Sequence, residues 1–206
     1  MSTAVASRFV FATVPELYPG TTMVCIGGGP SLTQADVDYV KGKAVVIAIN
    51  DAYRMAPWAD VLYACDARWW NWHKGVPSFQ GLKYSLQKAS AKWSGVQVLN
   101  NTGSDGLERK RNGLRTGRNG GFQAMNLAVH LGAKSIVLIG YDMQRTDGKE
   151  HWFGDHPNGQ TSPLGSFRGM FDTIVEPLKA LGITVTNCSR QTALTSFPCA
   201  RLEDRL

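Results

Sequence analysis

The chain has 206 residues, 43% of them hydrophobic and 18% charged, which predicts one sizeable soluble domain rather than two. No apolar run approaches the ~20 residues of a membrane span, and residues 1–8 lack a long apolar core, so neither a membrane helix nor a signal peptide is expected. The formal net charge of +6 favours an anionic partner: a nucleotide, a nucleic acid or an acidic glycan. Four widely spaced cysteines without a C-x-x-C pair predict reduced thiols in a cytoplasmic protein and exclude a zinc ribbon.

Apolar runs alternate with helical patterns along most of the chain. Strands are predicted over residues 22–26, 44–49, 61–65, 96–99, 135–140 and 183–186. Helices are predicted over residues 35–40, 122–131 and 167–181. Runs that are apolar on both faces are typical of a parallel sheet covered by helices. The order of elements therefore predicts an α/β fold, a Rossmann-like doubly wound, mostly parallel sheet with helices on both faces, and a single nucleotide-binding domain over residues 1–206.

A glycine-rich turn, Gly27-Gly28-Gly29-Pro30-Ser31-Leu32, connects the first predicted strand to the first predicted helix. Glycine lets backbone N–H groups approach an anion, and a helix N-terminus adds positive potential, so the turn has the parts of a phosphate cradle. The third glycine of the dinucleotide fingerprint is absent, because Leu32 takes its place. The same residues also suit a tight strand-to-helix turn that binds nothing.

Polar residues or glycines follow every predicted strand from 22–26 onward. They are Gly27 to Gly29, Asn50-Asp51, Asp66, Asn100-Asn101, Asp142 and Asn187. Ligands of open α/β sheets bind outside the carboxyl ends of the strands, so these positions together predict a common ligand crevice. Taken singly, each of them is also an ordinary turn former.

Two further stretches contain basic residues, the first beside tryptophans and the second beside glycines. Residues 68–73 (RWWNWH) follow Asp66 and suit either a stacking platform for a base or sugar or a helix that buries its tryptophans. Residues 108–118 contain five Lys or Arg side chains and two glycines. This basic loop is interpreted either as a mobile loop whose Arg115 and Arg118 contact phosphates or a nucleic-acid backbone, or as a solvated surface loop.

Two histidines, His151 and His156, lie in a loop over residues 143–166, beyond Asp142. Imidazole titrates near neutral pH, so both are candidate general bases. A zinc site would need a third ligand that the pattern does not provide, and no metal site is predicted. His73 and His130 are weaker candidates, and the helix that carries His130 is expected to pack on the sheet.

Three segments together resemble a known superfamily: Gly27 to Leu32, residues 49–53 (INDAY), and residues 119–142, which begin NGGFQA and end IGYD. The set resembles the small bacterial sialyltransferases that use CMP-sialic acid, the related motility-accessory (Maf) glycosyltransferases and the 6-hydroxymethylpterin pyrophosphokinase-like proteins. It is also similar to uncharacterised bacteriophage proteins of this size. The resemblance extends from Met23 to about Asp204.

The resemblance implies roles for individual residues. The turn from Gly28 to Ser31 would hold the nucleotide phosphate, and Asn50 would contact the nucleotide. Asp66 and Asp142 would match the polar residues that close the third strand and the late strand of the family. The candidate nucleotide-binding residues are Gly27, Gly28, Gly29, Pro30, Ser31, Asn50, Asp66, Gly120 and Asp142.

A histidine beyond the late acid is the general base in the sialyltransferases, and His156 fits that place better than His151. The chain also departs from their pattern. Gln144 stands where one phosphate-gripping tyrosine is expected, the second tyrosine has no counterpart, and Gly120 replaces a serine. Arginines of the basic loop would have to stabilise the leaving phosphate instead.

The sequence therefore predicts a nucleotide-sugar-dependent glycosyltransferase, similar to the sialyltransferases, with a histidine general base. Its donor would be a nucleotide sugar of the CMP-sugar type, and no cofactor or metal is required. One alternative is a pyrophosphokinase-like transferase in which Asp66 and Asp142 bind Mg²⁺. Another is a nucleic-acid-associated phage protein that modifies or binds DNA, which the net charge favours. The sequence is compatible with an oligomer.

Overall fold

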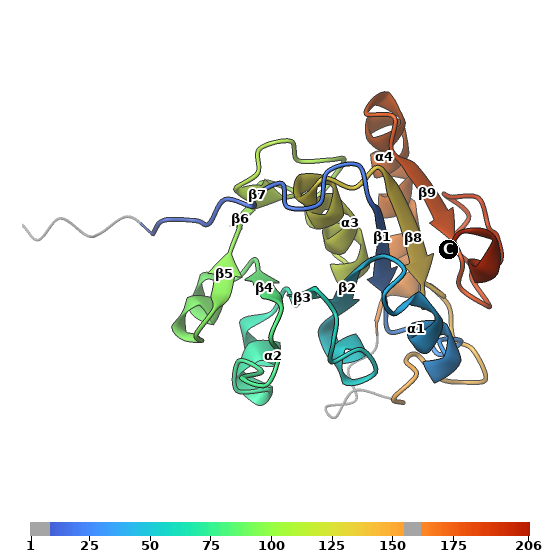
Figure 1. Ribbon diagram of the computed structural model, residues 1–206, viewed down its shortest axis with the longest axis horizontal. Helices are drawn as coiled ribbons and strands as arrows, with labels where there is room; N and C mark the ends of the chain where they lie inside the picture. The colour runs from blue at the N-terminus through green and yellow to red at the C-terminus, as the bar shows by residue number, and fades with distance from the viewer. Residues whose placement is uncertain (1–8, 155–161) are drawn as a thin grey trace, which may run out of the picture.

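A parallel β-sheet forms the centre of the computed structural model, which describes residues 9–154 and 162–206. Within these residues seven strands run in the order β5-β4-β3-β2-β1-β8-β9, and every neighbouring pair is parallel (Figure 1). The strands are β1 (Thr22–Ile26), β2 (Val45–Ile49), β3 (Val61–Tyr63), β4 (Leu82–Ser85), β5 (Val96–Val98), β8 (Ser135–Ile139) and β9 (Thr184–Asn187). The predicted Rossmann-like α/β fold is confirmed.

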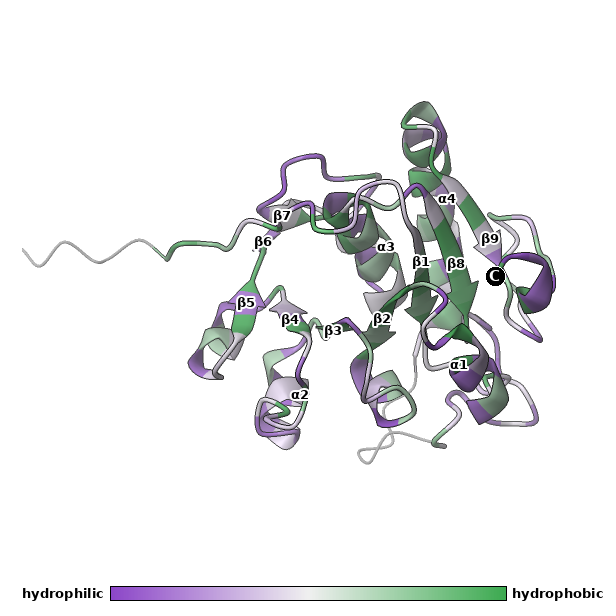
Figure 2. Cartoon of the chain, in the orientation of Figure 1, coloured by the Kyte–Doolittle hydropathy of each residue, from purple (hydrophilic) through white to green (hydrophobic). Residues whose placement is uncertain are grey.

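The predicted strands agree with the observed ones to within two residues at their ends, because their β-branched runs are buried on both faces. Figure 2 shows β1 and β8 as hydrophobic along their length. β4 was not predicted, because its four residues, LKYS, include a lysine and a serine. The fold accommodates both side chains: Lys83 Nζ donates to the Gly75 carbonyl at 3.0 Å, and Ser85 Oγ donates to the Cys65 carbonyl at 3.0 Å.

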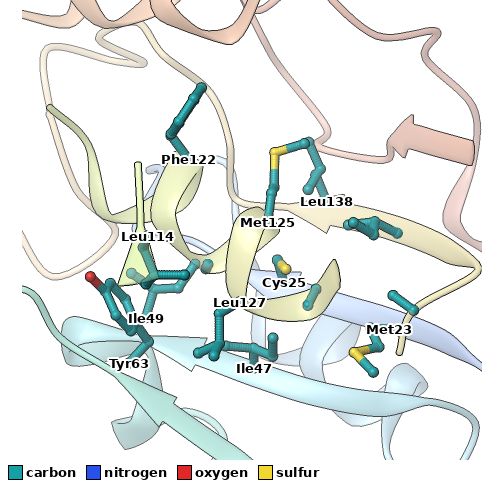
Figure 3. Packing of buried hydrophobic residues seen from close by; sticks show 14 of the residues in the cluster. Met23, Cys25, Ile47, Ile49, Tyr63, Leu114, Phe122, Met125, Leu127 and Leu138 are labelled. Carbon is teal, nitrogen blue, oxygen red and sulfur yellow. The ribbon is translucent and has the colours of Figure 1, made fainter. Parts of the chain in front are cut away.

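Helices cover both faces of the sheet. Alternate strand residues, such as Cys25 and Ile47, pack against α3 (Gly120–Leu131) and α4 (Leu164–Ala180). In Figure 3, Leu127 of α3 lies over Ile47, and Met125 lies toward Leu138. The intervening strand residues pack with α1 (Gln34–Val40) and α2 (Ala67–Trp72) on the opposite face. This two-residue alternation is the pleat of a strand, and it produces a core on each side of the sheet.

Short elements complete the chain. Within the described residues, 3-10 helices span Asn50–Arg54, Lys88–Lys92 and Leu202–Asp204. The long connection from β5 to α3 contains a small parallel pair, β6 (Asn100–Asn101) and β7 (Gly113–Leu114). Among the helices that the described residues form, none is long and apolar enough to cross a membrane.

The strand order places a topological switch point between β1 and β8. From β1 the chain proceeds outward through β2, β3, β4 and β5, and then returns through α3 to β8 on the other side of β1. At such a point the connections on the two sides diverge, which leaves a crevice outside the carboxyl ends of the strands. The glycine turn that follows β1 and the residues that follow β8 both lie at this place.

Candidate functional site

A cleft of about 960 Å³ opens at the carboxyl ends of the strands. Of the predicted site residues, its wall contains Gly27, Gly28, Gly29, Asn50, Asp66, Arg118, Gly120, Asp142 and His151. These residues follow β1, β2, β3 and β8 or precede α3, so the fold brings together five separate parts of the chain. Pro30, Ser31 and Arg115 belong to the described residues but not to the wall, and His156 lies outside the described residues.

Two of the other predicted strand-end positions have structural roles. Asn100-Asn101 forms β6, and the buried Asn187 donates from Nδ2 to Thr192 Oγ1 at 3.0 Å. Neither belongs to the cleft wall. These two strand ends therefore do not contribute to the predicted ligand crevice.

The first and third glycines of the turn let β1 approach the end of β8. The N–H groups of Gly27 and Gly29 donate to the carbonyls of Ile139 and Gly140, both at 2.8 Å. A Cβ on Gly27 would overlap the Gly140 carbonyl, and a Cβ on Gly29 would overlap the Asp142 carboxylate. These two glycines are thus required by close packing, and their N–H groups are used within the protein.

Gly28 differs from its two neighbours. A Cβ built on Gly28 would have only His151 Nδ1 nearby, at 3.2 Å, and the Gly28 carbonyl accepts from the Trp152 N–H at 3.0 Å. Gly28 therefore lies next to His151 and Trp152 in the wall of the cleft. It is the glycine of the turn at which an added Cβ would meet neither backbone nor the Asp142 carboxylate.

Asp142 connects the turn to the end of β8. Its carboxylate accepts from the Ser31 N–H and Ser31 Oγ, both at 2.8 Å, and from Thr146 Oγ1 at 3.2 Å. The residue is 1% exposed, and burial raises the pKa of the carboxyl above its usual value despite these hydrogen bonds. Asp142 thus fixes the turn, and any contact with a ligand would come in addition to this role.

The positive end of α1 is neutralised within the protein. Thr33 and Asp36 form a capping box, and the Arg190 guanidinium binds the Asp36 carboxylate through Nε and Nη2 at 2.8 Å each. The α1 N-terminus directly follows the glycine turn, but the carboxylate of Asp36 already neutralises its positive potential. It therefore contributes little to the binding of a further anion.

The start of α3 has the opposite character. Asn119 caps it by accepting from the N–H groups of Gly121 and Phe122, at 2.8 and 3.2 Å. Gly120, the first residue of α3, lines the cleft, and the exposed Arg118 lies immediately before the cap. A cation next to a positive helix end makes this part of the cleft attractive to an anion.

The basic loop, residues 108–118, is anchored to the body of the protein. The Glu108 carboxylate accepts from the N–H groups of Arg109 and Lys110, both at 2.9 Å, and these bonds hold its pKa below the usual value. Arg111 pairs with Glu16, and Arg115 lies 3.8 Å from Glu108. Of Arg115 and Arg118, the two cations predicted to contact phosphate or nucleic acid, only Arg118 lines the cleft.

A cluster that combines two predicted segments, residues 68–73 and the strand end Asn50-Asp51, lines the cleft beyond β2 and α2. His73 stacks on Trp69 with ring centroids 4.1 Å apart, and its Nδ1 lies 3.0 Å from the Tyr53 hydroxyl. Asp51 accepts from Trp69 Nε1 at 3.0 Å and lies 3.6 Å from His73 Nε2. Burial lowers the His73 pKa, so the ring is neutral near pH 7. The sequence patterns indicated residues 68–73 and Asp51 separately, and only the fold brings them together.

His151 is the predicted base that the structure places in the cleft. It lies beside Gly28, and its ring stacks on Phe153 with centroids 4.9 Å apart. His130 is buried in α3, where its Nε2 lies 2.8 Å from the Gly113 carbonyl oxygen. Burial raises the pKa of the Cys25 and Cys65 thiols to about 12, so both stay protonated at neutral pH and neither is a nucleophile.

No protein-family model, curated protein or solved structure matches the chain. Among the described residues, no group of three or more His, Cys, Asp or Glu side chains is arranged to hold a metal ion. The cleft thus combines a cationic end at α3, carboxylates from the ends of β2 and β3, and an imidazole beside Gly28.

Proposed function

We propose that the protein is a nucleotide-sugar-dependent glycosyltransferase that binds its donor in the cleft at the β1–β8 switch point. One observation carries the proposal: an open parallel sheet with a cleft at the carboxyl ends of its strands, where sheets of this kind bind nucleotides. The volume of about 960 Å³ lies within the range of small-molecule sites, about 300–1,000 Å³. The resemblance to the sialyltransferases supports the glycosyl chemistry.

The donor phosphate would lie between Gly28 and the start of α3. Gly28 lines the cleft on one side, and Arg118 with the Gly120 backbone supplies positive potential on the other. Cations fixed by the protein can stabilise the charge that develops on a departing phosphate, so transfer through this site needs no metal ion.

In the proposed reaction an acceptor hydroxyl oxygen attacks the anomeric carbon of the donor. The bond from that carbon to the phosphate oxygen breaks, and its electron pair leaves with the phosphate. A base takes the hydroxyl proton, and His151, which lines the cleft beside Gly28, is the candidate for this task. His156, the histidine that the resemblance favoured, remains the second candidate.

Nucleotide release from nucleotide sugars tests the proposal without a known acceptor, because water can take the acceptor's place. We expect at least one donor, with CMP sugars tried first, to release nucleotide in the presence of EDTA. Arg118→Ala should weaken donor binding about tenfold, or ~1.4 kcal/mol. Arg109→Ala is the matched control, because Arg109 is exposed on the same basic loop but does not line the cleft.

The histidine variants separate binding from chemistry. Loss of the general base should lower turnover roughly 10²–10⁴-fold and leave donor affinity nearly unchanged. His151→Ala and His156→Ala are each measured at saturating donor. If both variants keep the wild-type rate, the histidine mechanism is refuted.

The pyrophosphokinase-like alternative has one observation in its favour, since the carboxylates of Asp51 and Asp66 line the same cleft. One or two carboxylates together with substrate phosphates suffice to hold Mg²⁺. Transfer from a nucleoside triphosphate that EDTA abolishes, without any turnover of nucleotide sugars, would establish that function in place of the proposed one.

A further inference from the structure

The three tryptophans of α2 have different surroundings. Trp70 is completely buried and donates from Nε1 to the Ala64 carbonyl at 2.9 Å. Trp69 is 7% exposed, donates to Asp51 and packs edge-on against Trp70 with ring centroids 5.1 Å apart. Trp72 is 51% exposed, although it belongs to the same short helix. Two of the three rings therefore build the fold, and packing does not account for the third.

The exposed ring lies on the wall of the cleft. Trp72 and Arg68 both line it, and their spacing of four residues puts them on one face of α2. Asp66, which precedes the helix, lines the same region. A large aromatic surface that stands half exposed between charged groups is suited to a ligand with a flat ring and polar edges.

We propose that Trp72 is the stacking platform for the base of the nucleotide. The inference rests on the proposed function, since it takes the phosphate to lie near Gly28. α2 follows β3, which is two strands from β1, so the platform lies about 10 Å along the sheet from the glycine turn, at ~4.8 Å per strand. This separation puts the phosphate and the base at different ends of one cleft.

Stacking on a tryptophan tolerates every base, because each base has a π-face. The platform therefore binds any nucleotide base without discriminating among them. The polar edge groups of the base face Arg68 and Asp66. A ligand with the same phosphate but without a base should gain nothing from Trp72. This difference separates a base platform from a general apolar or sugar-binding surface.

Calorimetric titration of the full chain with AMP, CMP, GMP, UMP and ribose 5-phosphate tests the proposal. Trp72→Leu keeps an apolar side chain but removes the aromatic face, and Trp72→Phe restores a smaller one. Trp58→Leu is the control, because Trp58 lies near the start of β3, at the opposite end of the strands. The leucine variant at position 72 should bind the nucleotides about 5- to 150-fold more weakly, or ~1–3 kcal/mol. The phenylalanine variant should recover part of this loss.

Ribose 5-phosphate should bind the wild type and Trp72→Leu equally. Unchanged nucleotide affinity in Trp72→Leu would overturn the platform and leave the proposed nucleotide site standing. An equal loss for ribose 5-phosphate would identify a sugar-binding or apolar surface instead. If none of the four nucleotides binds the wild type, both the platform and the proposed function are refuted.

Discussion

The substitution Gly29→Ala examines the packing that forms the switch point. The added methyl group would overlap Asp142 Oδ1 and would lie 2.5 Å from Asp142 Cγ and 2.7 Å from the Gly140 carbonyl oxygen. One of these neighbours is backbone, and the other is a buried carboxylate that Ser31 holds by two hydrogen bonds. Neither can withdraw without a loss of bonding.

The expected cost has two parts. Overpacking of a well-packed site costs about 1–3 kcal/mol. Displacement of the Asp142 carboxylate weakens hydrogen bonds to a charged group, each of which contributes about 1.5–3 kcal/mol. Together they lower the free energy of unfolding by roughly 3–5 kcal/mol, which is a large share of the ~5–15 kcal/mol of an ordinary domain. The matching fall in Tm is about 6–20 °C for a chain of this size.

Urea unfolding and thermal melts of wild type, Gly29→Ala and Gly28→Ala measure this effect. The Gly28 variant is the matched control, since its Cβ would meet only the His151 side chain, at 3.2 Å. Its stability should fall by less than ~1 kcal/mol. The reasoning would be refuted if Gly29→Ala stayed within ~0.5 kcal/mol of wild type, or if both variants lost the same stability.

Three further substitutions probe the framework of the cleft. Asn119→Ala removes the cap of α3 and should lower the unfolding free energy by about 0.5–2 kcal/mol in urea. Glu108→Gln should be less stable than the wild type at pH 7, because the pKa of Glu108 is lowered in the folded state. In denaturation experiments at a series of pH values, this difference in stability should shrink as pH falls below the ordinary pKa of 4.5. Asp142 should show the opposite pH dependence, because its pKa is raised in the folded state, which therefore binds more protons than the unfolded state. The stability of the wild type relative to Asp142→Asn should decline as pH rises above 3.8, and a difference that does not change with pH would contradict this.

Local sequence determined the main strands and helices of this protein and their order. The apolar runs of β1 and β8 predict buried parallel strands, because a strand that is apolar on both faces is stable only between two layers of helices. The glycines after β1 and the polar residues after the other strands predict where a ligand crevice opens, since parallel strands all end at one edge. β4 escaped prediction because the contacts that bury Lys83 and Ser85 come from other parts of the chain.

Only the tertiary structure decided what each candidate residue does. Gly28 and Gly29 are equivalent in sequence, yet Gly29 packs against Asp142 while Gly28 faces His151. Trp69 and Trp72 belong to one helix, yet the first is buried and the second lines the cleft half exposed. In each pair the residue type is the same, and the difference arises from partners distant in the chain. Local propensity and spacing contain no information about those partners, because burial and hydrogen bonding are set by which segments the fold brings together.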